Sequence, residues 1–185
     1  MFARKTDDEL IGRALDGSER AWLTLVRRHE QRLYNYALRM SGNPDDAMDI
    51  LQDVLMSVYR NLDSFRGDSK FTTWLFRIAS FRCTDYFRRR NWQTTTLGDD
   101  EDVPDDSGHH EPEFLLSQVE DNEGIVHLMG LLPPEQRQVV ELKFFQHFTF
   151  DEIAGQLGIS PNTAKTRLYT ALSRMRAKSE LSLAS

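Results

Sequence analysis

The chain has 185 residues, of which 39% are hydrophobic and 28% charged, and its 29 acidic residues outnumber its 23 basic ones for a net charge of −6. The content of apolar and aromatic residues excludes a wholly disordered chain, and the single cysteine excludes an internal disulfide framework. No apolar run approaches the roughly 20 residues of a membrane span, and the acids near the N-terminus argue against an export signal.

The N-terminal half predicts four helices, because apolar residues recur at helical spacing between start and stop signals. Thr6 and Glu9 form a capping box, and Asn43 followed by Pro44 has the order of a helix start. The predicted ranges are Thr6 to Gly17, 18–40, 44–62 and about 71–90. In the third helix the stripe expected to face the core is Ile50, Leu51, Val54, Leu55, Val58, Tyr59 and Leu62.

Residues 93–113 contain eight acids and no basic residue, with almost no apolar side chains. Such a segment cannot bury enough surface to offset the entropy of ordering it, so we expect a flexible linker rather than a long surface loop. His109 and His110 could bind a metal weakly there, but a solvated linker is the simpler interpretation, and we expect no cofactor or metal. Without this segment, residues 1–92 carry a net +3 and residues 114–185 a net −1.

Four more helices are predicted after the linker, and no alternating strand pattern appears in the sequence. Their ranges are about 113–131, 134–146, 149–157 and 161–178. The expected fold class is therefore all-α, with an N-terminal helical bundle (1–92), the acidic linker (93–113) and a C-terminal four-helix domain (114–185).

The last two helices have the layout of a DNA-binding helix-turn-helix. Thr149 and Glu152 form a capping box, Gly158 can take the left-handed turn conformation, and Ser160 caps the second helix ahead of Pro161. Residues 161–178 contain five basic residues and no acid. The outer face expected to meet DNA is Asn162, Lys165, Thr166, Tyr169 and Thr170. A plain helical hairpin with a solvated basic face is the less favoured alternative.

Residues 64–92 combine eight aromatic residues with seven basic ones and only two acids. Aromatic rings beside guanidinium groups suit unstacked bases, because the rings stack and the cations follow the phosphates. We assign Phe71 and Phe76 to the core of the bundle. The face expected to meet a single strand is Trp74, Arg77, Phe81, Thr84 and the run Arg88, Arg89, Arg90.

The helix over 44–62 also has a polar side, opposite its apolar stripe. It consists of Asp49, Gln52, Asp53, Met56 and Arg60. Such a face is usually only solvated, but an exposed methionine within an acidic patch also suits docking to a basic partner helix.

Together these features resemble an extracytoplasmic-function (ECF) sigma factor of bacterial RNA polymerase. The resemblance extends from about residue 18 to 178. Four stretches carry it: PDDAMDILQDVLMSVYR (44–60), FRGDSKFTTWLFRIA (65–79), LPPEQRQVVELKFF (132–145) and FDEIAGQLGISPNTAKTRLYTAL (150–172).

The resemblance implies a role for each part. The N-terminal bundle would be sigma region 2, which binds core polymerase and opens the −10 element, and the C-terminal domain would be region 4, which reads the −35 element. Residues implied at the clamp coiled coil of the polymerase are Asp49, Gln52, Asp53 and Met56. Residues implied near −10 DNA are Lys70, Trp74, Arg77, Phe81, Arg88, Arg89 and Arg90. Residues implied at −35 DNA are Asn162, Lys165, Thr166, Arg167, Tyr169 and Thr170. Family members act in the cytoplasm, and an anti-sigma factor, frequently membrane-bound, often holds them inactive.

Five positions depart from the family pattern. Phe81 stands where members usually have Asn, Asn162 replaces Gly, Ala164 replaces Val, Thr170 replaces Arg, and His147 stands where Gly is common. Because several lie on the expected reading surfaces, they indicate an unusual promoter.

The residues show no catalytic constellation, and Cys83 has no His or Cys partner at a useful spacing, so we expect a binding protein and not an enzyme. The rival interpretation is a stand-alone helix-turn-helix regulator with a helical sensing domain. It explains poorly both the aromatic and basic helix and the acidic linker.

Overall fold

The computed structural model describes residues 5–93 and 122–183, and all regular elements there are helical. The predicted linker, with His109 and His110, lies outside the described residues. The chain divides into two compact units, 1–83 and 84–185, with the division inside helix α4. Each unit is described by itself.

The first unit begins with three capped helices, α1 (Asp7–Leu15), α2 (Glu19–Ser41) and α3 (Pro44–Asn61). The predicted capping box is present at Thr6, and the Asn43 side chain accepts from the backbone N–H groups of Asp45 and Asp46. A short 3-10 turn, η1 (Leu62–Ser64), follows α3, and α4 (Phe71–Gln93) comes next. The sequence prediction of four helices is confirmed.

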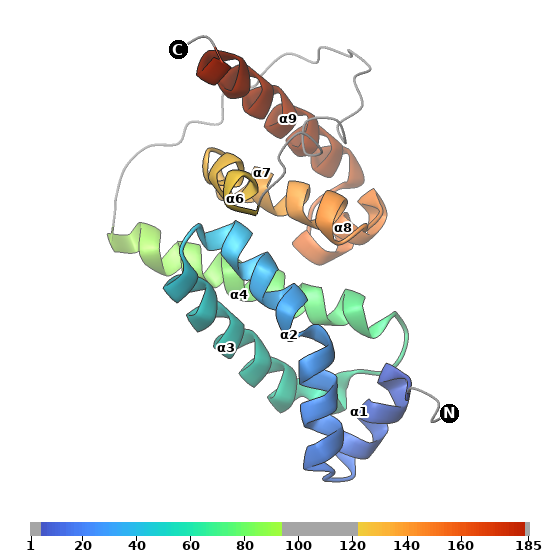
Figure 1. The fold of residues 1–185 in the computed structure, drawn as a ribbon. Helices are drawn as coiled ribbons and strands as arrows, with labels where there is room; N and C mark the ends of the chain where they lie inside the picture. The colour runs from blue at the N-terminus through green and yellow to red at the C-terminus, as the bar shows by residue number, and fades with distance from the viewer. Residues whose placement is uncertain (1–4, 94–121, 184–185) are drawn as a thin grey trace. The chain divides into compact units, whose positions relative to one another are not determined.

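The core of this unit forms where α2, α3 and α4 meet (Figure 1). The Tyr36 ring packs edge-on against Phe76, with centroids 5.5 Å apart, and its hydroxyl lies 3.2 Å from the Ser80 hydroxyl. Phe71 and Phe76 are buried as expected, and Cys83 is buried as well. Each buried aromatic ring of this kind removes roughly 150–250 Å² from water, so this contact fixes the rotation of α4 about its axis.

Tyr59 was wrongly expected in the core. Its side chain is 62% exposed and packs edge-on against Trp22 of α2, with ring centroids 5.1 Å apart. The apolar stripe of α3 is narrower than its sequence indicates, because Ile50, Val54 and Val58 already fill the contact with its neighbours.

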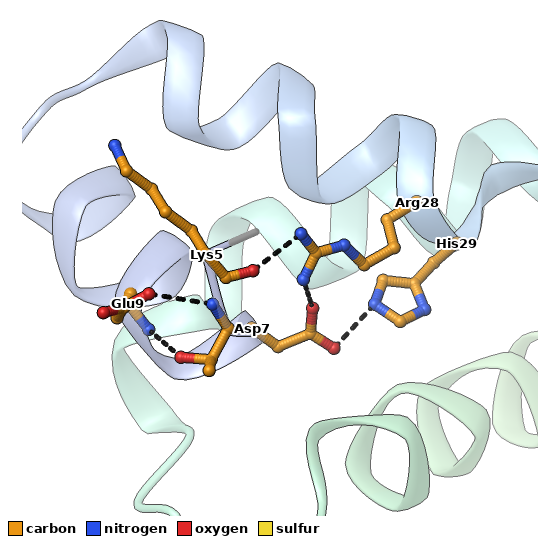
Figure 2. A network of polar contacts seen from close by, with 6 residues as sticks. Lys5, Asp7, Glu9, Arg28 and His29 are labelled. Carbon is orange, nitrogen blue, oxygen red and sulfur yellow. Dashed lines mark hydrogen bonds and ion pairs between the residues drawn. The ribbon is translucent and has the colours of Figure 1, made fainter. Parts of the chain in front are cut away.

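A polar network ties α1 to α2 (Figure 2). Asp7 accepts from Arg28 Nη1 at 2.5 Å and lies 2.9 Å from His29 Nε2, while Arg28 Nη2 donates to the Lys5 carbonyl at 2.8 Å. The Asp7 carboxylate therefore binds two neighbouring residues of α2 and holds the start of α1 against that helix.

Burial lowers the pKa of His29 below its ordinary value of 6.5, and the charge and hydrogen bond of Asp7, which act in the opposite direction, do not outweigh it. The folded protein therefore holds a neutral imidazole that donates its Nε2–H to Asp7. The unfolded chain takes up a proton at that ring near pH 6.5, whereas the folded chain does so only at lower pH.

This difference predicts that the free energy of unfolding falls as the pH is lowered below 6.5. Because one proton is involved, the slope reaches at most about 1.4 kcal/mol per pH unit. Urea unfolding followed by tryptophan fluorescence at pH 7.5, 6.5 and 5.5 measures it. His29→Gln should flatten the dependence between pH 6.5 and 5.5, and His127→Gln, at an exposed position of α6, should keep it; equal slopes in both variants would contradict the assignment.

The second unit contains α6 (Asn122–Gly130), α7 (Pro134–Val140), α8 (Phe150–Leu157) and α9 (Pro161–Leu183). The part of the predicted 113–131 helix before Asn122 lies outside the described residues. A single α-helix was expected over 134–146, but the chain changes at Glu141 to a wider π-type winding, η2 (Glu141–Phe145). There Glu141 is fully buried and its Oε1 accepts from Gln146 Nε2 at 2.8 Å, a pairing of side chains that sequence spacing does not reveal.

The helix-turn-helix of α8 and α9 follows its sequence prediction. Thr149 and Glu152 form the capping box, Gly158 has φ +68° and closes α8, and the Ser160 hydroxyl accepts from the Thr163 N–H at 3.0 Å. Ile153, Ala164, Leu168 and Met175 are buried between the helices. This packing leaves the opposite side of α9 exposed.

His147 has φ +59°, which explains why glycine is common at this position in the family that the sequence resembles. A left-handed conformation destabilises the folded state by about 1–2 kcal/mol for a residue other than glycine. Glycine avoids this strain, but its larger unfolded-state entropy offsets about 0.4–1 kcal/mol of the gain. We therefore expect His147→Gly to raise the free energy of unfolding by about 0.5–1 kcal/mol. Urea denaturation checks this, with His147→Ala as the control that retains the strain; a destabilised glycine variant would refute it.

Candidate nucleic-acid interface

The exposed side of α4 presents aromatic and basic side chains together. Lys70, Arg77 and Phe81 are exposed, and Phe81 is 59% accessible despite its size. Residues Leu75, Phe76, Ala79 and Cys83 bury the opposite side of the same helix. The helix therefore separates a core stripe from an outward face, as its sequence indicated.

Trp74 differs from the other predicted residues of this face because it is only half-exposed. Its ring lies 5.5 Å from Phe65 and 5.7 Å from Phe71, and Phe71 in turn lies 5.4 Å from His29. We call these four rings the aromatic cluster. Trp74 and Phe65 are the partly exposed members of the cluster, so Trp74 can supply a rigid edge for a base while supporting the fold.

Phe81 is held from beneath by Arg82. The Arg82 guanidinium lies 5.8 Å from the Phe81 centroid and its Nε donates to the Ser57 hydroxyl on α3 at 2.7 Å. An exposed ring with a cation on one side leaves its other side for a base.

The basic run at the end of α4 is exposed but engages its own helix. Arg88 pairs with Asp85, Arg89 lies 3.8 Å from the same carboxylate, and Arg90 donates to the Tyr86 hydroxyl at 2.6 Å. Exposed pairs of this kind contribute little, so phosphate groups can compete for these cations.

The predicted acidic face of α3 is on the surface. Asp49, Gln52 and Asp53 are exposed, and Met56 is 51% exposed beside them. The exposed Tyr59 ring, with the partly buried Trp22 ring packed against it, extends this face with apolar surface; Tyr59 had been expected in the core.

The outer side of α9 has a central row of polar and aromatic side chains with a cation on each side. Successive residues of a helix are turned by about 100°, so Asn162, Thr166 and Tyr169 point away from the buried stripe, while Lys165 and Arg167 lie on either side of Thr166. Tyr169 is 60% exposed, and the Thr166 hydroxyl donates to the Asn162 carbonyl at 3.1 Å. The hydroxyl oxygen and methyl of Thr166 therefore remain for base edges, and the two flanking cations suit the two phosphate walls of a groove.

Sequence reasoning missed Lys143. Its ammonium lies 4.8 Å from the centroid of Phe150, and Lys165 Nζ lies 5.7 Å from the same centroid. Two cations thus share one ring at the start of α8, although they are 22 residues apart in sequence, and only the folded chain reveals this. No group of three or more potential metal ligands occurs within the described ranges 5–93 and 122–183.

Comparison with known proteins identifies the family of the chain. The family described as Sigma-70 region 2 matches residues 25–93, and Sigma-70, region 4 matches residues 123–175. The ECF RNA polymerase sigma factor SigM of Mycobacterium tuberculosis is 32% identical over 92% of this chain and 83% of its own. The chain belongs to the ECF sigma factors.

More distant relatives of this ECF sigma factor give the same result. The ECF RNA polymerase sigma-E factor of Escherichia coli K12 is 28% identical over 92% of this chain and 93% of its own. The solved structure of CnrH in complex with the cytosolic domain of CnrY has a TM-score of 0.67 at 24% identity, covering 95% and 97% of the two chains. The helical fold of sigma regions 2 and 4 is therefore shown. Among the described helices, none has the length and apolar character needed to cross a membrane.

Proposed function

We propose that this sigma factor binds core RNA polymerase and directs initiation by reading the −10 element with α4 and the −35 element with α9. The observation that supports it best is the presence of two chemically different DNA-facing surfaces in one chain. The α4 surface combines exposed Phe81 and half-exposed Trp74 with cations, which suits single strands. The α9 surface is a central polar row between two cations, which suits duplex DNA.

The docking surface for core polymerase is the acidic face of α3. Asp49, Gln52, Asp53 and Met56 present carboxylates around an exposed thioether, a combination that suits a basic helical partner such as the clamp coiled coil of the polymerase. The neighbouring Tyr59 ring adds an apolar anchor of the kind that dominates binding energy at interfaces.

The proposed −10 DNA contacts are Lys70, Trp74, Arg77, Phe81 and the run Arg88–Arg90. The proposed contacts to the −35 duplex are Asn162, Lys165, Thr166, Arg167, Tyr169 and Thr170. The chain acts in the cytoplasm and performs no catalysis of its own. An anti-sigma factor controls it; the structurally similar sigma factor RpoE of Bartonella quintana has been solved in complex with the anti-sigma factor NepR.

Run-off transcription with purified core polymerase and candidate promoters tests the function. We expect a promoter-dependent transcript only when this chain is added. Asp49→Lys combined with Asp53→Lys should abolish association with core polymerase while leaving the fold intact, because both side chains are exposed. A chain that binds an operator without core polymerase and yields no transcript would instead support a stand-alone regulator.

The α9 geometry predicts two kinds of defect at the −35 element. Thr166→Ala or Tyr169→Ala should relax base preference at one position each by roughly 1–3 kcal/mol, whereas Arg167→Ala should weaken binding to all sequences. Binding of holoenzyme to a panel of single-base promoter variants measures this. Ser173→Ala is the control, since Ser173 shares the row of Thr166 but lies about 10 Å further along the helix. A uniform loss in all three reading variants would contradict the division of roles.

The α4 geometry predicts that Phe81→Ala impairs promoter opening more than closed-complex binding. Phe81 is a cleaner test than Trp74, because it is 59% exposed, whereas Trp74→Ala also removes packing against Phe65 and Phe71. Losing one stacking ring should weaken the open complex by about 1–3 kcal/mol. Permanganate footprints of the melted region report opening, and footprints of wild-type intensity would oppose this role.

A further inference from the structure

A groove between α1 and the first half of α2 has a strongly basic lining, and we call it the basic groove. Its volume is about 550 Å³, and its charged lining residues are Lys5, Arg13, Arg20, Arg27 and Arg28, with no acidic side chain among them. A volume of this size is typical of small-molecule sites. Three of the five cations precede residue 25, where the match to Sigma-70 region 2 begins, so the matched family region does not account for the groove.

Most of these cations are unpaired in the described part of the chain. Arg28 is engaged by the ion pair and the carbonyl contact described above, in which the Lys5 ammonium takes no part (Figure 2). Within residues 5–93 and 122–183, no ion pair or hydrogen bond is formed by the side chains of Lys5, Arg13, Arg20 and Arg27. An anion can therefore bind these four side chains without breaking existing pairs.

The cations approach the groove from two helices. Arg20 and Arg27 lie about two turns apart on α2, about 10 Å along the helix axis, and Arg13 lines the same groove from α1. Like charges that share one groove repel one another, and no lining acid offsets this repulsion. A bound anion would turn the repulsion into attraction, and guanidinium groups are the side chains best suited to phosphate because they bind two of its oxygens at once.

The start of α2 adds hydrogen-bond donors to the same groove. Ser18, which caps the helix, and Arg20 in its first turn both line the groove. The Ser18 hydroxyl oxygen accepts from the Ala21 N–H at 3.3 Å, so the hydroxyl hydrogen can be donated to a ligand. The N–H groups at a helix start carry partial positive charge, which favours phosphate further.

We propose that the basic groove binds a small polyphosphate, either free or as the phosphate chain of a nucleotide. The charges of such a ligand lie on adjacent phosphate groups, so one molecule can contact cations of both helices. A single phosphate group has too few charges to neutralise four cations. Binding would hold α1, which lies wholly before the matched family region, against α2. This ligand site adds to the proposed function and does not depend on it.

The test is isothermal titration calorimetry of the full chain with tripolyphosphate at constant ionic strength. Arg20→Gln and Arg27→Gln should each weaken binding about tenfold, because each removes charge-assisted hydrogen bonds. Both side chains are exposed, so without ligand the variants should keep the wild-type melting temperature. Arg66→Gln is the matched control, because Arg66 is exposed and lies outside the groove, and it should keep the wild-type affinity.

The exposed face of α4 is also basic, and Arg77→Gln separates it from the groove. Loss of tripolyphosphate binding in Arg77→Gln, with wild-type affinity in Arg20→Gln and Arg27→Gln, would place the ligand on α4 and overturn the inference. Equal affinity for sulfate and tripolyphosphate would show that the groove takes an adventitious ion only, and the inference would be wrong.

ATP and AMP distinguish the two sources of the phosphate chain. Equal affinity for ATP and tripolyphosphate would support a site for the phosphate chain alone, whereas tighter binding of ATP, with weak binding of AMP, would support a nucleotide. Arginine-dependent binding of polyglutamate without binding of tripolyphosphate would make the groove a docking surface for an acidic protein and overturn the inference. None of these titrations contains polymerase or promoter, so their failure leaves the proposed function intact.

Discussion

The burial of the apolar stripe of α4 is the constraint on which the first unit depends. Phe71, Phe76 and Cys83 are buried, with Phe76 packed against the Tyr36 ring of α2. A helix has one rotation about its axis, so fixing this stripe also fixes Arg77 and Phe81 on the outside. Transfer of the buried rings from water stabilises this rotation by roughly 1.5–3 kcal/mol for each side chain. The surface of α4 that we propose to bind DNA is therefore oriented by the burial of the opposite side of the same helix.

The same logic explains how an acidic chain can bind a polyanion. Its net charge of −6 does not determine the charge of any one surface. Exposed charges interact over about a Debye length of 8–10 Å and are screened beyond it. On α9 the two cations that flank Thr166 are neighbours along the helix, with no acid anywhere in residues 161–178. On α1, Asp7 pairs with Arg28, and the Glu9 carboxylate accepts from the Thr6 backbone N–H, while Asp8 is exposed. The arrangement of charge, and not its sum, decides what each surface attracts.

Features that depend on neighbours in sequence could be predicted, and features that depend on packing could not. Both capping boxes and the left-handed Gly158 arise within a few residues, so spacing alone identified them. Tyr59 was misplaced because its exposure depends on how Trp22 approaches from α2, and the winding of η2 depends on the buried pairing of Glu141 with Gln146. Most of the residues predicted on the outer sides of α4 and α9 are exposed, because a helix with a defined buried stripe has only one opposite side, whereas Trp74, Arg167 and Thr170 are partly buried.

The basic groove shows why a site can escape a residue-by-residue reading. Lys5, Arg13, Arg20 and Arg27 are spread over 23 positions, with five acids between the first and the third of them, so the local sequence carries no clear positive run. The pairing of Asp7 with Arg28 and His29 brings the two segments together and removes an acid from the space between them. The pair engages one of the five cations that line the groove, and the other four remain on the same groove.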